Sequence, residues 1–260
     1  MVFSKKQIEL VEKTRRLSFK NFDSIKISGD GVRIISNIFL NPDCLIDINL
    51  DEYIDKDVLL ADLSKHIVTA APATLAQYAQ DHKKEYLSRD DVIKCFALDH
   101  LNTIENNDII KLKGASYALA HALSVARVEN IYHNKGVVVA ELVADNIKYI
   151  NVIIPNNLKV EVEDSVWQHF GVVIDKVNEK DKEIISEQAQ HPEWQRILNE
   201  VKDTIIDYMD EKVFEKNVYK NIISEIENRQ SGDYKQGAGQ NEIDQAVKNN
   251  SKVNKIKFTN

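Results

Sequence analysis

Cysteine, proline and glycine are all scarce in this chain of 260 residues, which contains only two, four and eight of them, respectively. The two cysteines, Cys44 and Cys95, are too few for a disulfide framework, and their spacing is not that of a C-x-x-C motif. An all-β sandwich is disfavoured because its many tight turns depend on glycine and proline. The composition instead predicts helices with a modest sheet.

Long hydrophobic runs are missing as well. No apolar segment approaches the roughly 18 residues that a membrane-spanning helix requires. The opening MVFSKKQIELVEKTRR is charged from position 5 onward and lacks the apolar core of a secretion signal. With 43% hydrophobic residues the chain can still build a packed core. We therefore expect a soluble protein in a reducing, cytoplasmic setting.

Negative charge dominates the body of the chain. The formal net charge is −7, and residues 229–260 carry six basic against three acidic residues, so the first 228 residues stand at −10. An acidic body argues against indiscriminate coating of nucleic acid. We expect one α+β domain over 1–228, or two parts divided near 134–136, followed by a polar, flexible tail.

The tail over 229–260 has a basic tip. After Asp244 it contains no acid, and its lysines alternate with apolar side chains, a pattern that can dock an acidic groove or a phosphate backbone. A solvated end without function is the alternative. The partner-binding residues predicted here are Lys248, Lys252, Lys255, Lys257 and Phe258.

Helices and strands in the first half are predicted from periodicity and capping signals. Residues 24–35 surround Gly29-Asp30-Gly31 and are interpreted as a hairpin, with a helix from Asp30 as the competing interpretation. A strand is predicted over 44–50 from its alternation. Helices are predicted over 4–20, 57–70, 74–87 and 88–101, the last opened by a capping-box-like Ser88-Arg89-Asp90-Asp91.

The second half is predicted to contain a central alanine-rich helix over 108–132 and then an antiparallel meander over about 137–163. The meander strands are 137–143, 147–154 and 158–163. Helical structure is expected again after Asp164, through Val177. A long amphipathic helix is predicted over 192–228, with its apolar stripe beginning at Trp194. Such a stripe must be buried on the body or on another subunit, so we expect self-association.

No catalytic, cofactor-binding or metal-binding arrangement emerges from residue spacing. Asp47-Ile48-Asn49-Leu50-Asp51 resembles the start of a calcium loop, but Glu52 and Val58 occupy the positions that require glycine and glutamate. His121 is interpreted as a core histidine, and His133 as part of an ordinary helix-to-strand connection. Nucleophile elbows and phosphate-binding loops are absent. We expect no catalytic residues, no cofactor and no metal, and a protein that is not an enzyme.

Two functional hypotheses remain. The leading one is an assembly or adaptor protein that self-associates and contacts a protein partner through its tail. The alternative is a nucleic-acid-binding protein, specific for single strands, that uses basic side chains near aromatic ones. Besides the tail, the candidate nucleic-acid-binding residues are Arg15, Arg16, Lys83, Lys84, Tyr86 and Arg89.

Overall fold

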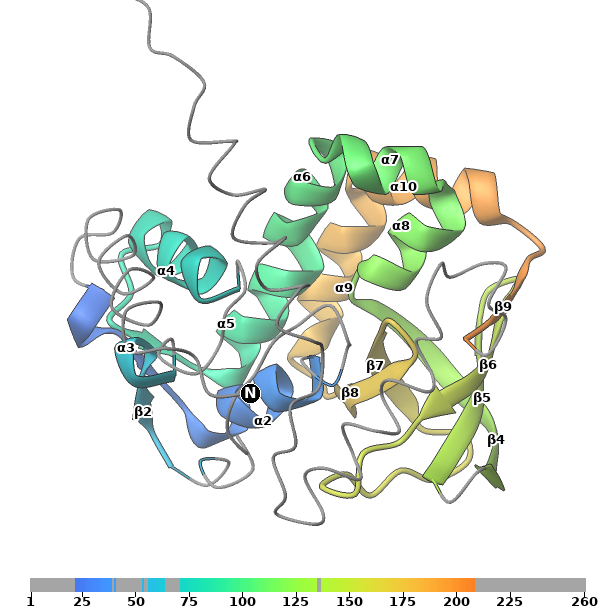
Figure 1. The fold of residues 1–260 in the computed structure, drawn as a ribbon, viewed down its shortest axis with the longest axis horizontal. Coiled ribbons are helices and arrows are strands. Elements are labelled where there is room, and N and C mark those ends of the chain that lie inside the picture. Colours follow the sequence, from blue (N-terminus) through green and yellow to red (C-terminus); the bar gives the residue numbers. More distant parts are fainter. Residues whose placement is uncertain are drawn as a thin grey trace, which may run out of the picture.

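The computed structural model describes residues 22–38, 40, 53, 56–63, 71–134 and 137–208. Within these ranges the chain is α+β, with helices gathered on one side and a closed five-stranded mixed β-barrel on the other (Figure 1). The predicted helix over 4–20, the predicted strand over 44–50, the second half of the predicted 192–228 helix and the tail lie outside the described residues.

A small three-stranded sheet opens the helical side. Its strands β1 (Lys26–Ile27), β2 (Val58–Leu59) and β3 (Tyr86–Leu87) lie in the order β2-β1-β3, with β1 and β3 parallel. The predicted hairpin over 24–35 is wrong, because helix α2 (Gly29–Ile38) follows β1 directly. Ser28 starts this helix, since its Oγ accepts a hydrogen bond from the Gly31 backbone N–H at 3.1 Å. The competing interpretation, a helix from about Asp30, is confirmed.

A second strand-to-helix connection has the same form. Strand β3 is followed by Ser88, which caps α5 (Arg89–Lys94) in a complete capping box with Asp91, so that sequence prediction is confirmed. The helix continues through a π-helical turn over Cys95–Asp99 into α6 (His100–Glu105). The remaining helices before the barrel are α3 (Leu60–Leu63), α4 (Ala71–Asp81), α7 (Asp108–Lys113) and α8 (Ala115–His121).

The barrel is formed by β4 (Ser124–Asn134), β5 (Val137–Ala144), β6 (Ile147–Ile153), β7 (Ser165–His169) and β8 (Val172–Lys176). Neighbours follow the order β5-β4-β7-β8-β6, and the β5–β6 pairing closes the ring. All of these pairings are antiparallel except β6–β8, which is parallel. The long strand β4 pairs with β7 in its first half and with β5 in its second half. A bulge between Val128 and Asn130 bends it from one partner toward the other.

Several predicted elements in this region are wrong. The central helix ends at His121, and residues 124–134 form β4 instead. Residues 164–177, predicted as helical, contain the β7–β8 hairpin, whose two-residue turn has positive φ at both Phe170 and Gly171. The meander strands over 137–143 and 147–154 are confirmed, whereas 158–163 forms no strand.

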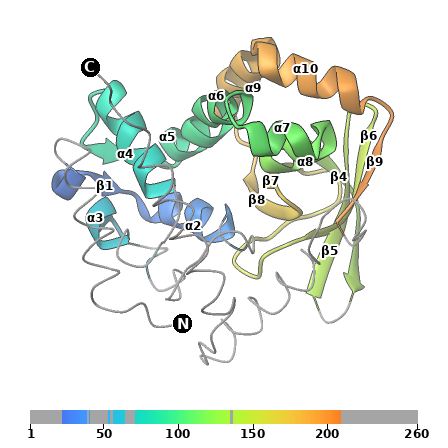
Figure 2. The same cartoon turned by 45° about the horizontal axis from the view of Figure 1, so that its top comes forward.

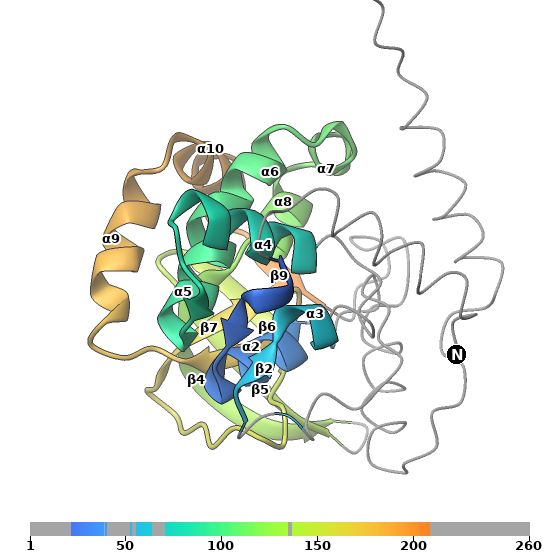
Figure 3. The same ribbon diagram turned by 90° about the vertical axis from the view of Figure 1, so that its left-hand side faces the viewer.

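The chain after the barrel returns to the helical side. Helix α9 (Asp181–Gln190) runs beside α5 (Figure 3), where Lys94 and Glu187 form a 2.9 Å ion pair. Helix α10 (Pro192–Val201) lies over α8 (Figure 2), and the predicted long helix stops there, because β9 (Ile205–Asp207) pairs in parallel with β6. Trp194, Ile197 and Val201 are buried within the chain itself. The first part of the apolar stripe is therefore not available for self-association.

One continuous hydrophobic core connects the helices to the barrel. The connection is reinforced by a buried group of charges that we call the arginine–aspartate hub: Arg33, Arg89, Asp175 and Asp181. Arg33 of α2 and Arg89 of α5 both bond Asp175 of β8, at 2.7 and 2.8 Å. The hub therefore fixes the helical side against the β7–β8 hairpin.

Candidate functional site

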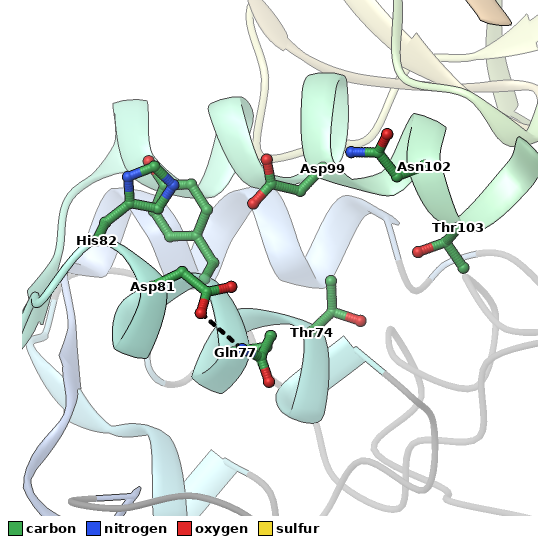
Figure 4. A pocket seen from close by; sticks show the side chains of 8 residues that line it. Thr74, Gln77, Asp81, His82, Asp99, Asn102 and Thr103 are labelled. Atoms are coloured by element: carbon green, nitrogen blue, oxygen red, sulfur yellow. Dashed lines mark hydrogen bonds between the residues drawn. The ribbon is translucent and has the colours of Figure 1, made fainter.

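A polar groove lies between α4 and the helix formed by α5, the π-helical turn and α6. It has a volume of about 550 Å³, within the range of small-ligand sites. Figure 4 shows Asp81 of α4 and Asp99 of the π-helical turn pointing into the space between the two helices. The residues that line this groove are Thr74, Gln77, Tyr78, Asp81, His82, Asp99, Asn102 and Thr103.

Asp99 is the most unusual member of the groove. Within the described part of the chain its carboxylate accepts no hydrogen bond and forms no salt bridge. Burial raises the pKa of Asp99; the nearby His82 lowers it, the Asp81 carboxylate raises it and Lys94 lowers it, and burial decides the net upward shift. π-Helical turns inside α-helices occur often at functional sites. A half-buried carboxylate without a donor is an energetic cost that a bound cation would relieve.

The other walls of the groove are more fully paired. Gln77 donates to Asp81 at 2.8 Å, which orients that carboxylate. The Tyr78 ring packs against the His82 ring at a centroid distance of 4.3 Å, and its hydroxyl lies 3.4 Å from Asp91. Burial, together with Asp91, raises the pKa of Tyr78, so this phenol stays neutral and donates hydrogen bonds at physiological pH.

The chemistry of this lining favours cation binding. Two carboxylates, an imidazole, two amides and two threonine hydroxyls suit a primary ammonium or guanidinium group that carries several N–H donors. A carboxyl group with a raised pKa beside a histidine can also act in general acid–base catalysis. As for metals, no group of three or more His, Cys, Asp or Glu side chains in the described ranges is arranged to hold an ion.

The structure brings three of the predicted nucleic-acid-binding residues together near the turn between α4 and β3. Lys83 is exposed, and its φ of 53° places it in the left-handed region. Lys84 is engaged in a 2.7 Å ion pair with Asp91. Tyr86 is 45% exposed and its hydroxyl bonds Asp57 at 3.2 Å. This is a small surface with one unengaged cation among the described residues.

Arg89, the fourth predicted residue of this group, does not join it. Its guanidinium points into the arginine–aspartate hub, where its five N–H donors meet Asp175, Asp181, Asp90 and the Lys176 carbonyl. A guanidinium has five donors in total, so none is left for a phosphate. In this structure the Arg89 guanidinium is fully engaged within the chain.

The remaining predicted residues have different outcomes. Arg15, Arg16 and all five partner-binding residues of the tail lie outside the described residues. His133 is exposed on β4, and His121 lies near two other histidines. Cys95 is buried, which raises the pKa of its thiol well above the ordinary value.

Residue spacing did not reveal the groove. Asp81-His82 and Asp99-His100 each point to different sides of a helix, and so neither pair forms a dyad on its own. The groove instead brings together Asp81 from the first pair and Asp99 from the second. Only the packing of α4 against the π-helical turn brings these two carboxylates together, and a single sequence contains no signal for that contact.

Comparison with known proteins gives no match: no family model, no curated protein and no solved structure shows significant similarity to this chain. Among the helices that the structure describes, none combines the length and the apolar character needed to cross a membrane. Functional inference therefore rests on the geometry of the chain itself.

Proposed function

We propose that this chain is a non-enzymatic assembly protein whose groove between α4 and α6 takes a lysine side chain from a protein partner. The observation that carries this proposal is the Asp99 carboxylate, which faces the groove opposite Asp81 without a donor from the described residues. A lysine ammonium supplies up to three N–H donors and a positive charge. It would lower the pKa of Asp99 and offset the cost of its burial.

The partner that fits this groove best is the tail of a second copy of the same chain. The tail tip over 246–260, AVKNNSKVNKIKFTN, has four lysines and no acid, whereas the first 228 residues carry −10. Opposite charges of this kind favour encounter and set register more than they add affinity. Tail-to-groove docking would produce the homo-oligomer that the sequence predicts. It would not require the apolar stripe that begins at Trp194, which is buried within the chain.

A peptide titration tests this docking. A fluorescein-labelled peptide of residues 246–260 is added to the full chain at low and at moderate salt, and anisotropy is measured. Saturable binding that weakens about tenfold with Asp99→Asn is expected, since a lost charged pair is worth on the order of 1.4 kcal/mol. A peptide with glutamine in place of its four lysines is the matched control. Equal affinity for wild type and Asp99→Asn would contradict the proposal.

A second candidate function is single-stranded nucleic-acid binding by the barrel. The strand order β4-β5-β6-β8-β7, closed on β4 and with parallel β6 and β8, resembles that of five-stranded Greek-key barrels of the OB type. Those barrels bind oligonucleotides on their second and third strands, which correspond to β5 and β6 here. This support is a fold-level analogy, because one barrel architecture serves many functions.

The outer face of the barrel offers little to a phosphate backbone. Lys148 of β6 pairs with Glu141 of β5 at 2.7 Å, and Arg127 of β4 pairs with Glu163 at 2.7 Å. A titration with labelled single-stranded DNA at two salt concentrations tests this candidate, with Lys148→Glu as the variant. Salt-sensitive binding that Lys148→Glu weakens would favour the barrel function. Absence of binding by wild type would remove it.

A further inference from the structure

Three histidines from different elements form a row between the helices and the barrel. His100 begins α6, His121 ends α8 and His169 ends β7. The ring centroids of His100 and His121 are 5.2 Å apart, and those of His121 and His169 are 5.7 Å apart. None of the three histidines of this histidine row lines the groove between α4 and α6.

The row is enclosed by aromatic rings rather than by charges. Phe96 faces His100 at 6.1 Å, Tyr117 faces His121 at 6.0 Å, and Phe170 lies 6.2 Å from His169. His169 is 5% exposed, and the Nδ1 atoms of His100 and His169 are buried without a hydrogen-bond partner among the residues that the structure describes. The Nζ of Lys113 lies 4.4 Å from the centroid of the Tyr117 ring, and its charge has the same sign as a protonated histidine.

This environment opposes protonation. Burial, together with the neighbouring His121, lowers the pKa of His100 to about 3. Burial also lowers the pKa of His169 well below its ordinary value, as do His121 and His100, while a hydrogen bond with the His121 backbone opposes the shift. No carboxylate contributes to either pKa. The imidazoles of His100 and His169 are therefore neutral in the folded chain near neutral pH, and each becomes more basic once it meets water.

The end of the β7–β8 hairpin away from its turn is held by the arginine–aspartate hub, in which Asp181 is protonated only at a lower pH than a histidine. Burial by itself would raise the pKa of Asp181, but hydrogen bonds from Arg89, the Asn178 backbone and Trp167 outweigh it, and the pKa is lowered. The Asp181 carboxylate therefore keeps its charge at pH values where exposed histidines are protonated. Asn37 adds a 2.9 Å hydrogen bond to the Ile174 carbonyl on the same side.

From this arrangement we propose that the histidine row is an acid-sensitive latch. Protonation of His100 and His169 releases α6 and α8 from the turn of the β7–β8 hairpin, while the arginine–aspartate hub keeps the other end of the hairpin attached. Release exposes the Phe170–Gly171 turn, which the folded chain anchors through the Phe170 backbone N–H and the Ala120 carbonyl at 2.7 Å. The latch is closed near neutral pH and opens on mild acidification.

Hydrogen–deuterium exchange of the full chain at about pH 7.5 and about pH 5, corrected for intrinsic exchange, tests the latch. Each histidine that is protonated only in the open state increases the opening equilibrium up to tenfold per pH unit below about 6.5. Protection in residues 115–121 and 166–173 should therefore fall by at least about tenfold at the lower pH. Helices α2 and α5, which surround the hub, should keep their protection.

The double variant His100→Gln and His169→Gln should lose this pH dependence, whereas His133→Gln, at an exposed histidine of β4, should keep it. Circular dichroism at neutral pH establishes that each variant folds, and the single variants replace the double one if it does not. An NMR titration of the imidazoles in the wild type needs no variant. Titration of His100 near its ordinary pKa in the folded chain, or equal loss of protection in α2, α5 and α8, would overturn the proposal.

Discussion

The guanidinium of Arg89 bonds both carboxylate oxygens of Asp181, at 2.6 and 2.9 Å, although the two residues are 92 positions apart. Asp181 is fully buried and also accepts a 2.9 Å hydrogen bond from the indole of Trp167. A helix of the helical side, a barrel strand and the helix after the barrel thus meet at one carboxylate. This contact joins the two sides of the structure in addition to the shared hydrophobic core.

Removal of the guanidinium should be costly for stability. Arg89→Ala leaves Asp181 buried without the guanidinium that pairs with it, and leaves Asp175 with Arg33 alone, so the free energy of unfolding should decrease by roughly 3–5 kcal/mol. Urea denaturation measures this change. Arg127→Ala, which removes an exposed salt bridge with Glu163, is the matched control and should cost less than about 1 kcal/mol. A loss as small as that of the control would show that the hub does not join the two sides.

The turn between β7 and β8 should tolerate no side chain at position 171. Gly171 has a φ of +81°, and a Cβ there would lie 2.7 Å from Cγ of Tyr208. Gly171→Ala should therefore lower the free energy of unfolding by about 1–3 kcal/mol through backbone strain and displacement of a buried ring. Gly114→Ala is informative beside it, since Gly114 also has positive φ but has no atom near its Cβ position. Thermal denaturation should show the larger loss at Gly171.

Stability should decrease in two stages on acidification. The folded-state pKa of His100 is about 3, below the ordinary 6.5, so the unfolded chain binds the proton first and stability falls as pH decreases below about 6.5. The slope is up to about 1.4 kcal/mol per pH unit for each such histidine. Asp181, with its lowered pKa, contributes stability that is lost only as pH falls below its ordinary value near 4. Urea midpoints across this pH range measure both stages, and a flat first stage would contradict the burial of the imidazoles.

Substitution in the groove should raise stability. Folding raises the pKa of Asp99, so its ionised form, which is the form present at neutral pH, destabilises the folded state. Asp99→Asn should increase the melting temperature by a few degrees while weakening peptide binding, as expected where function opposes stability. The exposed Asp145 gives the control variant Asp145→Asn, which should change neither property. A decrease in melting temperature for Asp99→Asn would indicate a stabilising contact at that carboxylate.

The sequence predicted local features better than the barrel. Ser88 and Asp91 predict the capping box, and apolar runs on either side of a turn predict the two meander strands over 137–143 and 147–154. The alanines within 108–132 favour one long helix. Val125, Val128 and Ile131 suit a strand, and the structure places them in β4, after the helix has ended at His121. The hairpin signal at Phe170-Gly171 was missed because apolar spacing on both sides also fits a helix.

The long-range features had no sequence signal. Residues 158–163 alternate as a strand should, yet they form no strand pairing, since β6 pairs instead with β8 and β9. The sequence around Arg89 fits a surface cation, because its partners Asp175 and Asp181 are 86 and 92 positions away along the chain. Likewise Asp81 and Asp99 belong to separate helices, and the three histidines of the latch belong to three elements. Tertiary packing decides all of these contacts.

Light scattering coupled to gel filtration tests the central claim, that the groove holds the basic tail of another copy. The full chain should be an oligomer at micromolar concentration in low salt, and Asp99→Asn, or glutamine in place of Lys252, Lys255 and Lys257, should convert it to a monomer. Asp145→Asn should leave the oligomer unchanged. A monomeric wild type across this concentration range, or an oligomer that the Asp99 and lysine variants do not disturb, would contradict the account.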